Sequence, residues 1–418
     1  MNLAAASTPR SRILLVLVIL ALPLLPSIVL RSVRIVQSWT LGSTPLFSSS
    51  FYGARRLHTP TMAYEKELLV AQLAVQRAAR LTKRVFHEQA KGTQSKDDKS
   101  PVTFGDYGAQ ALIIHALKSN FPDDEVVGEE DADDLRKNTT LSNQIWQMVS
   151  ETRLLDDEAE KTLGGPIPSE QAMLDVIDQG NSQGGRKGRI WALDPIDGTL
   201  GFLRGGQYAV CLALMVDGVP TVGVLGCPNL PVDDSKPLDQ NAGEKATDGE
   251  GYGVLFSAIA GQGATSRPLT GAGIQPGKPI HMNKLTSAAD LTNATFCESV
   301  EAKHSNHSQQ GAIASRLGIT RPSVRMDSQA KYASVSRGAG DIYLRLPSSR
   351  TYVEKIWDHA AGELIVREAG GVVTDVHGKR LDFGLGRLLK ENTGVVAAPK
   401  DVHATVLEAV QAVLASSN

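Results

Sequence analysis

The chain has 418 residues, a formal net charge of -2, 42% hydrophobic residues and 21% charged residues. This composition is ordinary for a soluble globular protein, and without a basic excess it excludes bulk binding of nucleic acid. The length allows a large core that is divided between two lobes.

The first 61 residues differ from the rest of the chain. Residues 13–30 form an almost uninterrupted apolar run with arginines on both sides, and no Asp or Glu precedes Glu65. Three interpretations stay open: an organellar transit peptide, a membrane anchor of nearly sufficient length, or an alternative start that makes Met62 the first residue of the functional protein. We therefore expect a leader over residues 1–61, a cytoplasmic or mitochondrial location, and membrane contact only if the leader is retained.

Residues 62–250 are expected to form a first, metal-binding lobe. Apolar residues at helical spacing predict helices over residues 64–89 and 106–117, and weaker ones over 142–149 and 169–178. β-rich runs predict strands over 126–127, 190–193, 208–216 and 219–225, the last two joined by a turn at Asp217 and Gly218.

Residues 251–418 are expected to form a second, nucleotide-binding lobe. Strands are predicted over 253–259, 295–300, 341–346 and 372–375, and helices over 309–317, 328–336 and 358–369. Strands and helices alternate along the whole chain, which favours layered sheets and helices over a pure bundle or sandwich. Cys211, Cys227 and Cys297 show no metal-binding spacing and are expected to be buried, reduced thiols.

Two acidic clusters about 160 residues apart dominate the chemistry. Asp194 and Asp197 lie in Trp-Ala-Leu-Asp-Pro-Ile-Asp-Gly-Thr at residues 191–199, and Asp358 lies in Trp-Asp-His-Ala-Ala-Gly at residues 357–362. Buried carboxylates repel one another unless a partner neutralises them, and no comparable cluster of Lys or Arg lies beside either motif. Hard oxygen ligands favour Mg²⁺ or a similar ion. With Glu129 after the strand at 126–127 and the carbonyl of Ile196, the clusters predict a site for two or three Mg²⁺ ions.

Three residues near these clusters have two interpretations each. Gly198 and Thr199 follow the first cluster and are either a helix start with a capping threonine or a place where backbone N–H groups approach an anion. Asp106 is either the N-cap of the helix over residues 106–117 or a general base that orients a metal-bound water together with Thr199.

The motifs at 128–130, 194–199 and 357–362 resemble, in order, the three signature motifs of the Mg²⁺-dependent, lithium-sensitive phosphatases of the inositol monophosphatase superfamily. Within it the chain looks most similar to the fungal and plant 3'(2'),5'-bisphosphate nucleotidases, from about Met62 to near the C-terminus. The segments that carry this closer resemblance are residues 99–107, 120–124, 184–189, 327–332 and 343–347.

The resemblance implies roles for individual residues. It implies that Asp106 and Thr199 activate the attacking water. The implied metal ligands are Glu129, Asp194, the carbonyl of Ile196, Asp197 and Asp358. The implied substrate contacts are Thr199, His304, Ser328, Lys331 and Arg345. A small length difference before Ser328 leaves His307 as the alternative to His304.

The resemblance also implies a fold and a reaction. The fold is an α/β (α+β) layered αβαβα sandwich. The reaction is Mg²⁺-dependent hydrolysis of the 3'-phosphate of adenosine 3',5'-bisphosphate to AMP, and of 3'-phosphoadenylyl sulfate to adenylyl sulfate. Roles in sulfate assimilation and salt tolerance follow, and a monomer that takes a small nucleotide and no nucleic-acid polymer is expected. Two alternatives stay open: an inositol mono- or polyphosphate phosphatase, and a membrane-tethered nucleotide sensor without catalysis.

Overall fold

The first acidic cluster lies at the end of β2 (Arg189–Asp197), a strand of a seven-stranded sheet. The structure is a computed structural model that describes residues 63–90, 101–235, 238, 251–300, 307–346 and 352–416. These residues belong to one compact unit, residues 60–418, and the expected leader over residues 1–61 lies outside them. Among the helices of this part of the chain, none combines the length and apolar character that a membrane crossing requires.

The first sheet has its strands in chain order, with β1 and β2 parallel and the other neighbours antiparallel. Its strands besides β2 are β1 (Glu125–Gly128), β3 (Ala209–Val216), β4 (Val219–Pro231), β5 (Tyr252–Ile259), β6 (Ala264–Pro268) and β7 (Lys278–Ile280). β3 and β4 meet at the predicted turn, where Asp217 and Gly218 both have positive φ, as a two-residue hairpin of type I′ requires. The sheet continues on both sides of residue 250, where the sequence places the border between lobes.

The second sheet has five strands in the order β11-β12-β10-β8-β9. They are β8 (Phe296–Glu298), β9 (Val324–Arg325), β10 (Ile342–Arg345), β11 (Gly371–Thr374) and β12 (Val395–Pro399). β10 pairs in parallel with β8 and antiparallel with β12. The predicted strands over 295–300, 341–346 and 372–375 are therefore confirmed as members of one sheet.

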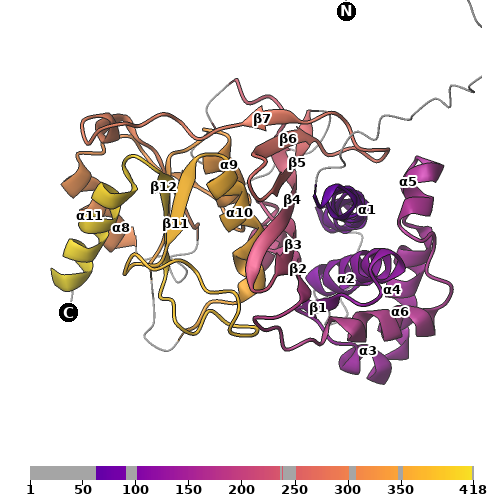
Figure 1. Ribbon diagram of the computed structural model, residues 1–418. Coiled ribbons are helices and arrows are strands. Elements are labelled where there is room, and N and C mark those ends of the chain that lie inside the picture. The colour runs from indigo at the N-terminus through magenta and orange to yellow at the C-terminus, as the bar shows by residue number, and fades with distance from the viewer. Residues whose placement is uncertain are drawn as a thin grey trace, which may run out of the picture. The chain divides into compact units, whose positions relative to one another are not determined.

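Helices cover both sheets and separate them (Figure 1). The outer face of the first sheet is covered by α1 (Glu65–Ala90) and α2 (Pro101–Asn120). Next to α2 lie the shorter α3 (Asp133–Lys137), α4 (Thr139–Glu151), α5 (Asp157–Thr162) and α6 (Glu170–Ile177). Between the sheets lie α9 (Ala330–Ser336) and α10 (Ala360–Glu368), and beyond the second sheet lie α8 (His307–Leu317) and α11 (His403–Ser416). The short α7 (Thr199–Arg204) follows β2, and 3-10 turns occur at Asp178–Gly180, Asp290–Asn293 and Ile356–Asp358.

Side chains on the two faces of β2 show why this layering is stable. Trp191 and Leu193 pack against α1 and α2, whereas Ile190 and Ala192 face the cluster that contains α9 and α10. Both faces of the strand are apolar because helices cover both, and each face removes large side chains from water. The layers read α, β, α, β, α across Figure 1, which confirms the predicted sandwich.

For two residues, one of the open interpretations, a helix-capping role, does not hold. Asp106 does not cap α2, because the helix begins at Pro101 and places Asp106 in its second turn. Proline suits the first helical position, where its missing N–H is not needed. Thr199 does not cap α7 either: Gly198, with φ of 89°, holds the cap position and Thr199 is the first helical residue. The three cysteines are free and buried, as predicted.

The glycine of the Trp-Asp-His-Ala-Ala-Gly motif has a packing role. A Cβ atom on Gly362 in α10 would lie 2.3 Å from Cδ2 of Tyr332 in α9, so the two helices approach too closely for any other residue. We expect Gly362→Ala to lower the free energy of unfolding by about 1–3 kcal/mol, measured by urea titration. Gly311→Ala in α8 is the matched control, because Gly311 is exposed with no atom near its Cβ position. The control should gain up to about 1 kcal/mol, and an equal gain at Gly362 would contradict the packing argument.

Candidate active site

The end of β2 bends where its two aspartates leave the sheet. Its pairing with β3 shifts register between Asp194 and Asp197, around a proline that has no N–H to donate to the ladder. Both aspartates line a cavity of about 340 Å³, a size that suits a small-molecule ligand. Ile196, between them, also lines the cavity, and its buried side chain belongs to the core beside α2.

A third aspartate reaches this cavity from the other end of the chain. Asp358 ends the 3-10 turn Ile356–Asp358 just before α10, and carboxylate oxygens of Asp194, Asp197 and Asp358 lie within 4.8 Å of one another. Atom Oδ1 of Asp194 is buried and has no hydrogen-bond partner. Three clustered carboxylates with an unsatisfied oxygen are the donor set that a hard divalent cation requires, so the residues fit the predicted metal site.

The electrostatics of this cluster are unfavourable without a positive partner. Burial and the neighbouring carboxylates, Glu129 foremost, raise the pKa of Asp194 well above its ordinary value. Burial together with the charge of Asp197 raises the pKa of Asp358 to about 7. Burial also raises the pKa of Asp197 to about 6, although the nearby ammonium of Lys331 opposes this shift. Each rise measures how strongly the site resists carrying its full negative charge.

Glu129 follows β1 and also lines the cavity, but its partner was not expected. Lys355 donates from Nζ to Oε1 of Glu129 at 2.7 Å, across 226 positions of sequence. Lys355 lies only three residues before Asp358, so one lysine accompanies the second motif although no cluster of Lys or Arg does. Within the described part of the chain, a single lysine placed on Glu129 still leaves the three aspartates without a hydrogen-bonded cation of their own.

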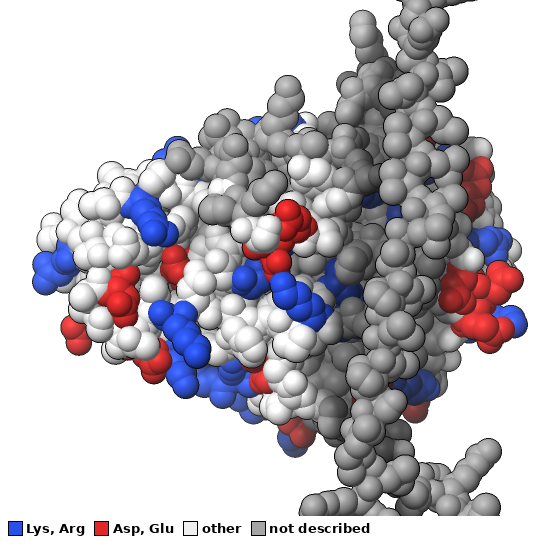
Figure 2. Space-filling model, turned by 90° about the horizontal axis from the view of Figure 1, so that it is seen from above, with Lys and Arg blue, Asp and Glu red and all other residues white. Residues whose placement is uncertain are grey.

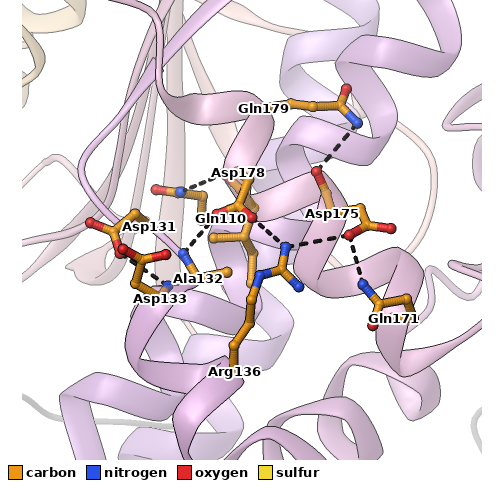
Figure 3. Close-up of polar contacts among 10 residues, drawn as sticks. Gln110, Asp131, Ala132, Asp133, Arg136, Gln171, Asp175, Asp178 and Gln179 are labelled. Atoms are coloured by element: carbon orange, nitrogen blue, oxygen red, sulfur yellow. Dashed lines mark hydrogen bonds and ion pairs between the residues drawn. The ribbon is translucent and has the colours of Figure 1, made fainter.

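The backbone that carries Glu129 is held from behind by α2. Gln110, fully buried, donates from Nε2 to the carbonyl of Glu130 at 2.7 Å and accepts from its N–H at 3.1 Å. A Cβ atom on Gly128 would lie 2.7 Å from Oε1 of Gln110, so the preceding residue is glycine for lack of space. In Figure 3, Asp178 lies between Ala132 and Arg136. It accepts a hydrogen bond from the N–H of Ala132 and another from the guanidinium of Arg136.

The cavity is also lined by two cations, of which Lys331 is buried and Arg345 is half-buried. Lys331, 2% exposed in α9, donates from Nζ to the carbonyl of Met326 at 3.3 Å. Arg345, at the end of β10, donates from Nε to Glu354 at 2.7 Å. Ser328, which also lines the cavity, has a φ of 67°, and a Cβ atom on Gly198 would lie 2.8 Å from the Cβ of Ser328. Gly198 is therefore required both for its positive φ and for this close approach.

Two expected residues are not placed on the cavity wall. His304 lies outside the described residues, and the alternative His307 has Nε2 3.0 Å from the carbonyl of Ser299, itself a lining residue. Asp106 is buried next to the cavity and does not line it. Burial and the charges of Glu130 and Glu129 raise the pKa of Asp106 well above its ordinary value. Thr199 lines the cavity as expected, from the first turn of α7.

Gln329 is a site residue that the sequence analysis missed. Its backbone N–H donates to Asp197, its side chain donates to the carbonyl of Trp357 at 2.8 Å, and it accepts from the N–H of Gly362 at 2.9 Å. One buried residue, through its backbone N–H and its side-chain amide, thus ties the first acidic cluster to the second. Its only sequence signal is its position beside Ser328, because a neutral side chain has no charge that points to chemistry.

On the face shown in Figure 2, the charges do not form a nucleic-acid track. Outside the grey atoms, blue and red side chains lie singly or in small groups among white ones. No broad field of one sign is visible there, in agreement with the net charge of -2.

The two hydrogen bonds between the side chain of Gln110 and the backbone of Glu130, here called the Gln110 clamp, can be tested by mutation. We expect Gln110→Leu to lower the free energy of unfolding by about 1–3 kcal/mol, because it leaves the part-buried N–H and carbonyl of Glu130 without those bonds. Hydrogen–deuterium exchange should rise in the peptide spanning residues 128–132. The control is Gln171→Leu, an exposed residue bonded to Asp175 at 2.8 Å, which should stay within about 0.5 kcal/mol. Unchanged exchange at 128–132 would refute the clamp.

Comparisons with known proteins agree with this architecture. A model of the inositol monophosphatase family matches residues 64–415. A 3'(2'),5'-bisphosphate nucleotidase of Emericella nidulans is 60% identical over 353 residues, covering 84% of this chain and 99% of that protein. One of Schizosaccharomyces pombe is 49% identical over 357 residues, covering 84% and 97%. The inositol monophosphatase-II structure from Staphylococcus aureus, 18% identical, covers 83% of this chain and 96% of that chain with a TM-score of 0.50, and is similar in fold. The resemblance seen in the sequence is confirmed, and the chain belongs to the inositol monophosphatase family.

Proposed function

We propose that this protein is a 3'(2'),5'-bisphosphate nucleotidase that hydrolyses the 3'-phosphate of adenosine 3',5'-bisphosphate to give AMP and phosphate. By the same chemistry it would convert 3'-phosphoadenylyl sulfate to adenylyl sulfate. One observation carries the proposal: a single cavity is lined both by three clustered carboxylates and by two cations, the buried Lys331 and the half-buried Arg345. The similarity to nucleotidases of this name over almost their whole length supports it.

The carboxylates and the cations of the cavity fit two different phosphates. A carboxylate cluster repels a phosphate unless divalent cations bridge them, so the phosphate that reacts belongs at the aspartates. A second phosphate that is not cleaved needs cations supplied by the protein itself. Burial lowers the pKa of Lys331, while the nearby Asp327 opposes this shift, so an added anion would stabilise its charged form. A substrate with one phosphate would leave these cations without a phosphate to bind.

The metal belongs to the same proposal. Glu129, Asp194, Asp197 and Asp358, with the carbonyl of Ile196, would hold two or three Mg²⁺ ions, as the fit of the aspartate cluster supports. Such ions supply charge neutralisation at the phosphate and make water a better nucleophile at neutral pH. Thr199 and Asp106 are proposed to orient the water and take its proton. The water oxygen forms a bond to phosphorus, the bond from phosphorus to the 3'-oxygen breaks, and that oxygen leaves with a proton.

The decisive experiment measures phosphate release by the full chain with Mg²⁺ from a panel of substrates. Adenosine 3',5'-bisphosphate should exceed inositol 1,4-bisphosphate in kcat/KM by about tenfold or more. Comparable values would favour an inositol phosphatase, and no release from any substrate would favour a non-catalytic binding protein. Titration with Li⁺ should inhibit the release.

Removal of the charge of Asp358 should have opposite effects on stability without metal and on turnover with Mg²⁺. A carboxyl group whose pKa is raised to about 7 by folding stabilises the metal-free protein at low pH, and this contribution is lost as the pH rises through 7. Asp358→Asn should therefore raise the thermal midpoint in EDTA most at pH 8 and by a smaller amount at pH 5.5, which lies between the ordinary pKa of 3.8 and the raised pKa of about 7. It should also lower turnover with Mg²⁺ by orders of magnitude, because it removes a negative ligand.

The control for this variant is Asp401→Asn, an exposed residue outside the cavity lining. It should change neither the turnover nor the pH dependence of the midpoint. Near wild-type turnover of Asp358→Asn with saturating Mg²⁺ would count decisively against the proposed metal site.

A further inference from the structure

A chain of buried polar residues stands behind Arg345. Glu354 accepts from Nε of Arg345 at 2.7 Å with one oxygen, and its other oxygen lies 3.1 Å from Nε2 of His359. The other ring nitrogen of His359, Nδ1, lies 2.9 Å from the hydroxyl of Tyr332 in α9. Glu354 is 7% exposed, and His359 and Tyr332 are fully buried. None of these three contacts was expected from the sequence.

The same residues could be mistaken for a metal site. Ligand atoms of Glu354, Asp358 and His359 lie within 4.8 Å of one another. Both carboxylate oxygens of Glu354 and both ring nitrogens of His359 are, however, already used in the hydrogen bonds of this chain. A cation there would have to break them, so the group is a hydrogen-bond network rather than a second metal centre.

The bond to Glu354 uses only Nε of Arg345, so the terminal nitrogens of the guanidinium can donate to other acceptors. Glu354 accepts from Nε, on the side of the guanidinium fork, and the hydroxyl of Tyr352 lies 3.4 Å from Nη2. Arg345 and Tyr352 both line the cavity. A guanidinium binds phosphate well only when its plane is fixed, because the two N–H groups must meet two oxygens together. A carboxylate that is itself held on its far side is a suitable means of fixing that plane.

We propose that Glu354 is a positioning residue for substrate binding: anchored through His359 to Tyr332, it fixes the plane of Arg345 for the phosphate that is not cleaved. This inference rests on the proposed function, in which Arg345 contacts that phosphate. His359 directly follows Asp358 in sequence, so the network that holds the arginine also holds the backbone next to the carboxylate cluster. The grip on one phosphate and the site for the other therefore share a rigid support.

The test compares two substrates that differ only in the phosphate assigned to Arg345. They are adenosine 3',5'-bisphosphate and adenosine 3'-monophosphate, and the measured quantity is the ratio of their kcat/KM values. The wild-type ratio should favour the bisphosphate, and Arg345→Met should lose most of that preference, with Lys331 supplying the remainder. Glu354→Gln should lower the ratio by about 10- to 100-fold, mostly through KM for the bisphosphate, because a charge-assisted bond is lost. The double variant should lose no more than Arg345→Met alone.

A matched control separates positioning from stability. Glu160→Gln breaks another buried ion pair, in which Arg77 donates to Glu160 at 2.8 Å, and neither residue lines the cavity. It should lower the thermal midpoint and leave the substrate ratio unchanged. Tyr332→Phe removes only the anchoring hydroxyl and should lower the ratio in the same direction by a smaller factor, which keeps the test decisive if Glu354→Gln does not fold.

The outcomes distinguish this inference from the proposed function. If Arg345→Met loses most of the preference but Glu354→Gln and Tyr332→Phe keep it, the positioning role is refuted and the nucleotidase assignment stands. If Glu354→Gln lowers both substrates equally, its role is structural, which again refutes the inference. If wild type shows no preference, the phosphate contact of Arg345 fails and the inference falls with it. If no substrate releases phosphate, the proposed function itself fails.

Discussion

The repulsion among three buried carboxylates is the constraint on which this structure depends. Asp194, Asp197 and Asp358 lie within 4.8 Å of one another in a wall where burial raises the pKa of each. Folding brings them together against their own electrostatics, so other contacts must hold the segments that carry them. The apolar layers provide those contacts: both faces of β2 and most of α10 are buried in large cores.

The middle layer of the sandwich is where this constraint is met. α9 and α10 lie between the sheets, and their close approach at Gly362 and Tyr332 sets where the turn carrying Asp358 points. Gln329, at the start of α9, bonds to Asp197 on one side and to the backbone of Trp357 on the other. Two acidic motifs that are far apart in sequence thus share one support.

The sequence predicts much of the local structure and the residues of the carboxylate cluster. Asp-Pro-Ile-Asp-Gly-Thr carries strong turn signals after a β-rich run, so the position of its two aspartates was predictable. The start of α2 was not predicted, because Thr103 and Gly105 are poor helix formers and outweighed the signal of Pro101, a residue that suits the first helical position. β9, with two residues, is likewise defined by its pairing with β8 rather than by its own composition.

Ion pairs between residues far apart in the chain could not be predicted from the sequence, for a related reason. Lys355 and Glu129 are 226 positions apart, and a side chain's partner depends on tertiary placement that no local pattern records. The consequence for the site is chemical. Of the cations that line the described part of the cavity, Lys355 is bonded to Glu129 and Arg345 to Glu354, while Lys331 donates to a carbonyl. We therefore propose that the aspartate cluster takes an external cation and that Lys331 and the end of the Arg345 fork take an anion. A substrate with two phosphates would meet both needs. Divalent ions bound to one phosphate would neutralise the aspartates, and the second phosphate would bind Lys331 and Arg345.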